Sequence, residues 1–171
     1  MTTKQTEVAI IGGGLSGLAC ALRLHQAGAT CVVLEAADRV GGRIGVTVDD
    51  RGQTIGDLGP TWVWPPAQQT VSRWLDELDV QPLPQFEEGD AVVERSREEQ
   101  PRRMPLPGQW GMTRLVGGPW SLVAEIEKRL PPECIKTSTP VSQIQRNGNA
   151  LDVTSVDGTT TSASQVVIAA P

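Results

Sequence analysis

The stretch VAIIGGGLSGLACAL, residues 8–22, places four glycines inside an apolar run near the amino terminus. Residues 7–11 are apolar and β-branched and stop at glycine, which predicts a strand. From Leu15 the apolar residues follow helical spacing up to Gly28, a common helix stop. CVVLEA, residues 31–36, predicts a second buried strand. Strand, helix and strand within about thirty residues indicate a βαβ unit with parallel strands and a right-handed crossover.

The glycines of this unit fit the pattern G-x-G-x-x-G at Gly12, Gly14 and Gly17. Gly12 permits a sharp turn, Gly14 lets a pyrophosphate approach the backbone, and Gly17 lets helix and strand pack closely. The amides at the start of the helix then face the phosphates, and Ser16 adds a hydroxyl donor. Gly13 has no role in this interpretation.

An acidic residue follows the second predicted strand. Glu35 lies eighteen residues after Gly17 and would accept hydrogen bonds from both ribose hydroxyls of an adenosine. A carboxylate there repels a 2′-phosphate, which argues against NADP. The segment EAADRVGGR, residues 35–43, then brings a tight glycine loop and two arginines, Arg39 and Arg43. Such a loop can offer amides and a guanidinium to the pyrophosphate, although solvated arginines remain the alternative.

Two further helices and several strands are expected along the chain. Prolines at residues 65–66 suit the first turn of a helix that runs to residue 80, and Pro119 suits the first turn of another that ends at residue 130. Residues 80–109 favour loop or hairpin, with a strand candidate at 91–93. Asn-Gly and Asp-Gly turns separate three strands of a predicted meander at 140–146, 150–156 and 159–163.

A fully apolar strand is predicted at residues 165–171, and no later segment covers it, so we expect the chain to be part of a longer protein. The fold class expected is α/β, a Rossmann-like fold with a parallel sheet plus a three-stranded antiparallel meander. Residues 1–64 form the nucleotide-binding βαβ unit and its glycine loop, 65–139 begin a substrate or helical region, and 140–171 return to the first domain.

The bulk composition excludes several classes of function. Fifteen basic and twenty acidic side chains give a net charge of −5, without a basic stripe for nucleic acid. The arginines near residues 95–103 alternate with glutamates and indicate a solvated loop. Three cysteines and one histidine lack the spacing of a disulfide framework or metal site, so no metal and a cytoplasmic location are expected. No segment reaches membrane-spanning length.

Three stretches together resemble the flavin-containing amine oxidase family: IGGGLSGLACALRLHQAG at residues 11–28, VVLEAADRVGGR at 32–43 and DLGPTWVWP at 57–65. The pattern LEA-x-DR-x-GGR behind the glycine motif is the more specific part. The resemblance continues through PVSQI at 140–144 and VVIAAP at 166–171 and covers nearly the whole chain.

The resemblance implies a bound FAD. The residues it assigns to the pyrophosphate are Gly12, Gly14, Leu15, Ser16 and Gly42, and Gly17 of the glycine motif is counted among the cofactor-binding residues. Glu35 and Ala36 would hold the adenosine ribose, and Arg43 would serve the phosphates or the flavin side. Gly59 and Trp62 would approach the flavin, and the backbone of Val141 would meet the adenine. The catalytic residues of the family lie in its later part, so none is assigned here.

The expected function is that of an amino-terminal portion of an FAD-dependent oxidoreductase, which oxidises an amine to an imine and reduces O₂ to hydrogen peroxide. Its partners would be a small-molecule amine and O₂, with either a second copy of the chain or a completing polypeptide. Two alternatives stay open. One is a related flavoprotein oxidase or desaturase acting on amino acids or hydrophobic substrates; the other is a dinucleotide-binding module or subunit without turnover.

Overall fold

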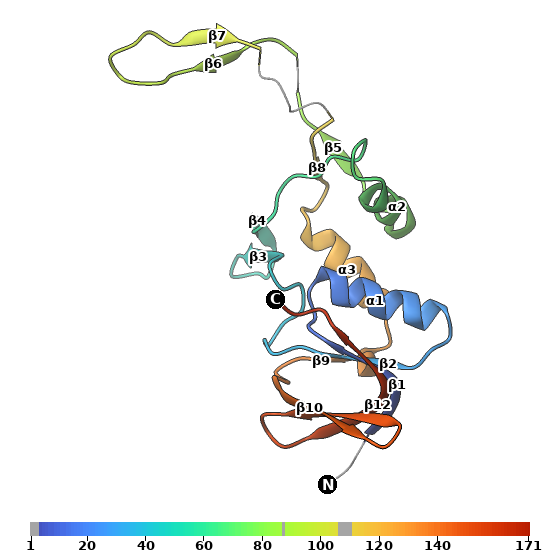
Figure 1. The fold of residues 1–171 in the computed structure, drawn as a ribbon. Helices are drawn as coiled ribbons and strands as arrows, with labels where there is room; N and C mark the ends of the chain where they lie inside the picture. Colours follow the sequence, from blue (N-terminus) through green and yellow to red (C-terminus); the bar gives the residue numbers. More distant parts are fainter. Residues whose placement is uncertain (1–3, 87, 106–110) are drawn as a thin grey trace. The chain divides into compact units, whose positions relative to one another are not determined.

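The computed structural model describes residues 4–86, 88–105 and 111–171. The chain divides into two compact units (Figure 1). The first unit joins residues 1–60 to residues 117–171, and the second comprises residues 61–116. The sequence-based boundaries at 64 and 139 differ from this division, because the segment after Gly117 packs with the amino-terminal βαβ unit.

The first unit is an α/β structure built on one mixed sheet. Its elements in chain order are β1 (Lys4–Ile11), α1 (Leu15–Gln26), β2 (Cys31–Leu34), β3 (Gly45–Val48), β4 (Thr54–Leu58), α3 (Trp120–Arg129), the 3₁₀ turn η1 (Pro132–Cys134), β9 (Ile135–Lys136), β10 (Val141–Asn147), β11 (Ala150–Ser155) and β12 (Thr160–Ile168). The strand order β10-β11-β12-β1-β2-β9 confirms the predicted βαβ unit and meander. β1 pairs in parallel with both β2 and β12, whereas β10, β11 and β12 pair antiparallel.

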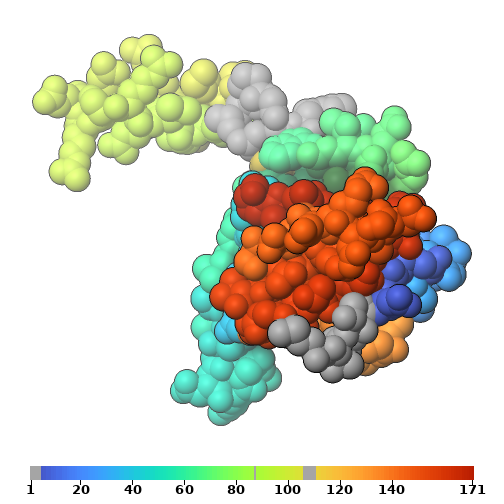
Figure 2. Space-filling view, turned by 60° about the horizontal axis from the view of Figure 1, so that its bottom comes forward, coloured from blue at the N-terminus to red at the C-terminus, as the bar shows by residue number. Residues whose placement is uncertain are grey.

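The separate strands predicted at 159–163 and 165–171 are one strand. β12 pairs antiparallel with β11 along its first half and runs parallel to β1 along its whole length, from Thr161 opposite Lys4 to Ile168 opposite Ile11. Only Ser164 separates the two predicted segments, and no glycine or proline interrupts the chain there, so the ladder continues. In Figure 2 the meander strands form one orange-to-red surface beside the blue amino-terminal segment.

The two helices of the first unit cover one face of the sheet, where they lie side by side (Figure 1). Helix α1 buries Leu18, Ala21 and Leu22, and α3 buries Leu122, Val123 and Ile126. A second cluster joins β1 and β2 to the meander through Ala9, Val32, Leu34, Val153 and Ala163. Burial on both faces explains why β2 and the second half of β1, residues 8–11, are uninterrupted apolar runs.

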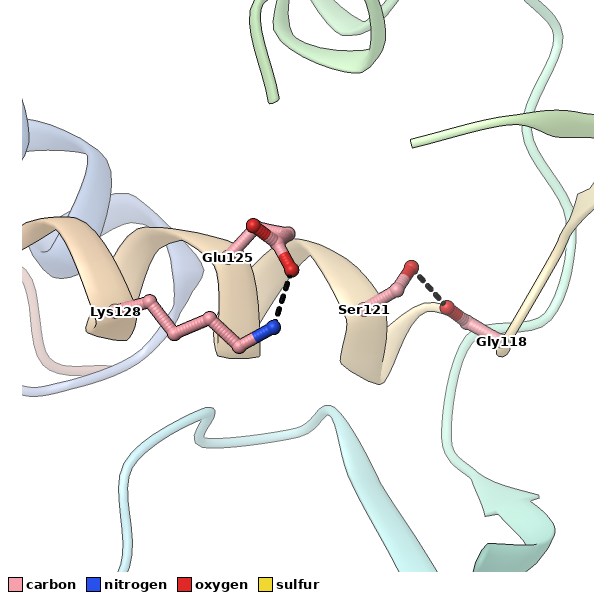
Figure 3. A network of polar contacts seen from close by, with 4 residues as sticks. All are labelled: Gly118, Ser121, Glu125 and Lys128. Carbon is pink, nitrogen blue, oxygen red and sulfur yellow. Dashed lines mark hydrogen bonds and ion pairs between the residues drawn. The ribbon is translucent and has the colours of Figure 1, made fainter. Parts of the chain in front are cut away.

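A turn that contains two glycines directly precedes α3. Gly117 and Gly118 both have positive φ, and a Cβ at Gly118 would collide with the carboxylate of Asp57. Ser121 Oγ donates a 2.6 Å hydrogen bond to the carbonyl of Gly118 (Figure 3). Pro119 stands at the N-cap with helical backbone angles, close to its expected place in the first turn. One turn further, Lys128 Nζ and Glu125 form an ion pair of 2.6 Å on the exposed side of the helix.

Three strands of the first unit were not expected. β3 and β4 form a hairpin that follows the glycine loop, and β9 contributes only two residues to the sheet edge. Val48, Ile55 and Leu58 on the hairpin are more than half exposed, so no strong burial pattern marks these strands in the sequence. β9 is held by its pairing with Val33 and Leu34, a contact between distant segments.

In the part that the structure describes, the second unit contains α2 (Gln69–Leu78) and two pairs of antiparallel strands. Its strands are β5 (Pro82–Pro84), β6 (Ala91–Val93), β7 (Arg102–Met104) and β8 (Thr113–Leu115), with β5 paired to β8 and β6 to β7. The hairpin prediction at 91–93 agrees with β6. The prolines at 65–66 lie before α2 rather than in its first turn, because the Trp64 carbonyl accepts the amides of Ala67 and Gln68 in a preceding turn.

Candidate functional site

In the glycine turn between β1 and α1, Gly12 and Gly17 are closely packed against other backbone, whereas Gly14 borders open space. Gly12 has φ +105°, and a Cβ there would lie 2.9 Å from the backbone of Ala169, which follows β12. A Cβ at Gly17 would collide with the carbonyl of Gly12. At Gly14, by contrast, a Cβ would meet no described atom within 4 Å. Close packing therefore explains the first and third glycines, and approach by a ligand is left as the explanation for the second.

The first amides of α1 lie beside this open position. Gly14 is the N-cap and has no side chain to cap the helix, and the first helical hydrogen bond runs from Leu18 N–H to Gly14 O. The amides of Leu15, Ser16 and Gly17 precede that bond and belong to the positive end of the helix dipole. Ser16 is exposed, so its hydroxyl is accessible from solvent. This end of the helix can receive an anion.

The carboxylate of Glu35 is fixed by backbone amides. Gly13 N–H donates to one oxygen at 2.5 Å, and Ala37 N–H donates to the other at 2.8 Å. A Cβ at Gly13 would lie 3.0 Å from the Glu35 side chain, so glycine leaves the room that this contact needs. Sequence reasoning missed this role of Gly13, because nothing in the local pattern reveals a contact between residues so far apart in the chain.

The second glycine loop lies against the first. Gly41 N–H donates to Gly13 O at 2.8 Å, and a Cβ at Gly42 would lie 3.2 Å from Gly14 Cα. Both Gly41 and Gly42 have positive φ, which favours glycine at these two positions. Arg43, which follows them, is exposed and has no side-chain partner among the described residues. An exposed arginine thus follows a loop whose backbone lies against the open, amide-rich turn.

Gly59 and Trp62 lie in different units. A Cβ at Gly59, which has φ +100°, would collide with the carbonyl of Arg43, so this glycine brings the end of the β3–β4 hairpin against the second glycine loop. Trp62 belongs to the second unit, where the guanidinium of Arg114 stands 4.6 Å from its ring centroid. The approach of both residues to a flavin stays a prediction.

The predicted adenosine contacts lie at one end of β2. Thr139 N–H donates to Glu35 O, and Ser138 N–H donates to Ala37 O, so the segment after β9 runs beside residues 35–37. Val141 begins β10 two residues later, with its half-buried side chain packed on the core cluster of the sheet. Ala36 is exposed at the same end of the strand. The structure thus places the segments that carry these three predicted residues next to one another.

The cysteines lie away from this end of β2. Cys31 is the first residue of the strand, and its Sγ lies 3.5 Å from Sγ of buried Cys134. Burial and then the contact with Cys134 raise the pKa of Cys31 to about 12, and burial also raises the pKa of Cys134. Both side chains are therefore neutral thiols near pH 7. Within residues 4–86, 88–105 and 111–171, no cluster of three or more His, Cys, Asp or Glu side chains could hold a metal ion.

The arginine-rich segment belongs to the β6–β7 hairpin of the second unit. Arg95, Arg102 and Arg103 line an open hollow of about 180 Å³ together with Glu99. All four residues are exposed, as expected for a solvated loop. In the part of the chain that the structure describes, no helix is both long enough and apolar enough to cross a membrane.

The first unit therefore gathers groups that suit a nucleotide diphosphate. Amides at the start of α1, the second glycine loop and the Arg43 cation can receive a pyrophosphate, and Glu35 can accept from ribose hydroxyls. The predicted residues brought together in this unit are Gly12, Gly14, Leu15, Ser16, Gly17, Glu35, Ala36, Gly42, Arg43, Gly59 and Val141. Their individual binding roles stay predictions.

Comparison with known proteins places this site in a family. The family model for flavin containing amine oxidoreductases matches residues 15–115 and 93–171. Flavin-containing amine oxidase B of Homo sapiens is 35% identical over 108 residues, covering 63% of this chain and 20% of that protein. A flavin-containing amine oxidase of Oncorhynchus mykiss is 35% identical over 136 residues, covering 78% of this chain and 26% of that protein.

A solved structure of putrescine oxidase bound to putrescine shares the fold. Its TM-score is 0.83 at 20% sequence identity, and the match covers 99% of this chain and 59% of that one. The chain spans between a fifth and about a quarter of the human and trout relatives, at 20% and 26% of their lengths. Because the family model matches both halves of the chain, this protein belongs to the flavin containing amine oxidoreductase family.

Proposed function

We propose that this chain forms the FAD-binding portion of an amine oxidase. The observation that carries the proposal is the open face at Gly14, where two glycine loops and the first amides of α1 meet beside the amide-held carboxylate of Glu35. A turn used only for packing would need glycine at positions 12 and 17 but not at position 14. The similarity to flavin-containing amine oxidases selects FAD among the dinucleotides.

The residues present fit the adenosine diphosphate part of FAD. The amides of Leu15 and Ser16 offer donors to one side of the pyrophosphate, and Gly42 and Arg43 offer a backbone amide and a cation to the other. Glu35 already accepts one amide on each oxygen, and each oxygen keeps a further lone pair for a ribose hydroxyl. Its negative charge disfavours a 2′-phosphate.

In the intact protein, bound FAD supplies the electron acceptor for oxidation of a primary or secondary amine to an imine, and O₂ then accepts the electrons to give hydrogen peroxide. The work of this chain is to bind and orient the cofactor. Hydrogen bonds within the chain hold the two glycine turns, so binding needs little further ordering of their backbone. We propose that the residues that contact the amine lie outside these 171 residues, either in the same protein or in a partner chain.

The cofactor assignment is tested by incubating the purified chain with FAD or NAD, followed by gel filtration and absorption spectroscopy. We expect the protein fraction to retain a flavin spectrum. Retention of NAD without FAD would overturn the assignment. The activity is tested by adding amines to the intact, flavin-loaded protein and measuring hydrogen peroxide. Peroxide released with amines supports the proposal, whereas release with amino acids alone would assign a related class of oxidase.

We also propose a cytoplasmic location. The three free cysteines at positions 20, 31 and 134 support a reducing compartment, since thiols persist there. Recovery of the protein in a membrane or secreted fraction would contradict this proposal.

A further inference from the structure

The side chain of Arg39 is turned back into the second glycine loop. Its Nη1 donates to the carbonyls of Val40 and Ile44, each at 3.0 Å, and its Nη2 donates to the carbonyl of Gly42 at 3.2 Å. One guanidinium therefore ties the beginning, the middle and the end of residues 40–44. Arginine alone among the side chains offers several donors in a rigid fork of this kind.

These three hydrogen bonds also determine where the loop amides point. In a trans peptide the carbonyl of one residue and the N–H of the next point in opposite directions. The Val40 carbonyl faces Arg39, and accordingly the Gly41 N–H points away and donates to Gly13 O in the first glycine loop. The Gly42 carbonyl also faces Arg39, so the N–H of Arg43 points away from the guanidinium.

The guanidinium fits closely among the glycines of the loop. A Cβ at Gly45 would lie 3.2 Å from Nη2 of Arg39, and a Cβ at Gly41 would lie 3.5 Å from Nη1. The same Cβ built on Gly41 would also lie 2.8 Å from the ring of Trp120 at the start of α3, so no larger residue fits at this position. The loop is thus held between an arginine and a helix of the same unit.

We propose that Arg39 is a positioning residue of the nucleotide site, which holds the second glycine loop in the conformation that presents its amides and Arg43 to the pyrophosphate. The inference rests on the proposed nucleotide binding but does not depend on the flavin. Arg39 and Arg43 then have different roles: the first binds carbonyls of its own loop, and the second has no side-chain partner among the described residues and can bind a phosphate.

The test uses ADP as the probe, because ADP is common to FAD and NAD. Its affinity is measured by calorimetry for the parent 171-residue chain and for Arg39→Ala, Arg39→Lys and a matched control, Arg51→Ala. Arg51 is an exposed arginine in the turn of the β3–β4 hairpin, with no side-chain partner among the described residues. Hydrogen exchange of the Gly41 and Leu22 amides, without nucleotide, separates loosening of the loop from loss of the fold.

We expect Arg39→Ala to weaken ADP binding about ten- to hundredfold, because a loosened loop must be ordered on binding. Arg39→Lys weakens it as well, since a single ammonium does not span the three carbonyls, and this variant decides the question if Arg39→Ala fails to fold. The Gly41 amide loses protection in both variants while the amide of Leu22 in α1 keeps it. Arg51→Ala binds ADP like the parent.

Folded Arg39 variants with the parent's affinity would overturn the inference. So would weakened ADP binding with unchanged protection of Gly41, because Arg39 would then contact the phosphates itself. A parent that binds ADP but not FAD would refute the flavin assignment while leaving the role of Arg39 intact. A parent that binds neither would refute the proposed function and this inference together.

Discussion

Replacing Gly14 and Gly17 separately by alanine distinguishes a ligand-facing glycine from a packing glycine. Gly17 is buried in α1, and its new Cβ would collide with the Gly12 carbonyl. The shifts that accommodate such a collision lower the free energy of unfolding by about 1–3 kcal/mol. Gly14 has φ −69° and ψ 174°, angles that alanine adopts freely, and its new Cβ would enter open space. The entropic gain of alanine and its poorer N-capping are each below about 1 kcal/mol and oppose one another.

For FAD binding we expect the opposite order, with Gly14→Ala lowering the affinity more than Gly17→Ala does. At Gly14 the added methyl occupies the space where the pyrophosphate would approach the amides, and loss of one hydrogen bond to a charged group costs about 2–3 kcal/mol. That free energy corresponds to a loss of affinity of about thirty- to 150-fold. Urea unfolding measures the stability of both variants, and flavin fluorescence quenching measures their affinity. A folded Gly14→Ala chain that binds FAD like the parent would show that the pyrophosphate does not approach Gly14.

Three further perturbations follow from the contacts described. Glu35→Gln should lower the affinity for ADP about tenfold. The affinity for 2′-phosphorylated ADP should fall less, because the variant no longer carries the negative charge that repels the 2′-phosphate. Equal losses of affinity for the two ligands, measured by calorimetry, would contradict this. The unfolded chain releases the Cys31 proton near pH 9.0 and the folded chain near pH 12, so unfolding free energy should fall between these values, with a shallower fall in Cys31→Ser; identical slopes in urea titrations would be inconsistent with the raised pKa. Ile126→Ala, at a side chain 1% exposed, should cost about 2–5 kcal/mol. Ile55→Ala, which truncates a side chain that is 69% exposed, should change the free energy of unfolding by less than about 0.5 kcal/mol. Similar losses of stability in the two variants would contradict the assigned core.

The βαβ unit and the meander could be predicted because their signals are local. Apolar runs, glycine stops and the Asn-Gly and Asp-Gly turns each act within a few residues. The continuation of β12 beside β1 could not be predicted from such signals, since it depends on pairing between the two ends of the chain. The same holds for β9, whose two residues have no apolar pattern of their own.

The candidate site was predictable in outline but not in its contacts. The G-x-G-x-x-G spacing indicates which backbone a phosphate would approach, and Glu35 follows from its distance along the chain. Two contacts needed the structure: the Gly13 amide on the Glu35 carboxylate, and Arg39 on the carbonyls of its own loop. In both cases the partner atoms belong to backbone, whose direction depends on tertiary packing rather than on residue type.

The most direct test of the nucleotide site is a crystal structure of the chain grown with FAD. We expect the pyrophosphate to lie between the amides of Leu15 and Ser16 and the loop of Gly42 and Arg43, with the adenosine ribose hydrogen-bonded to Glu35. A nucleotide bound elsewhere, or a pyrophosphate that does not approach Gly14, would contradict it.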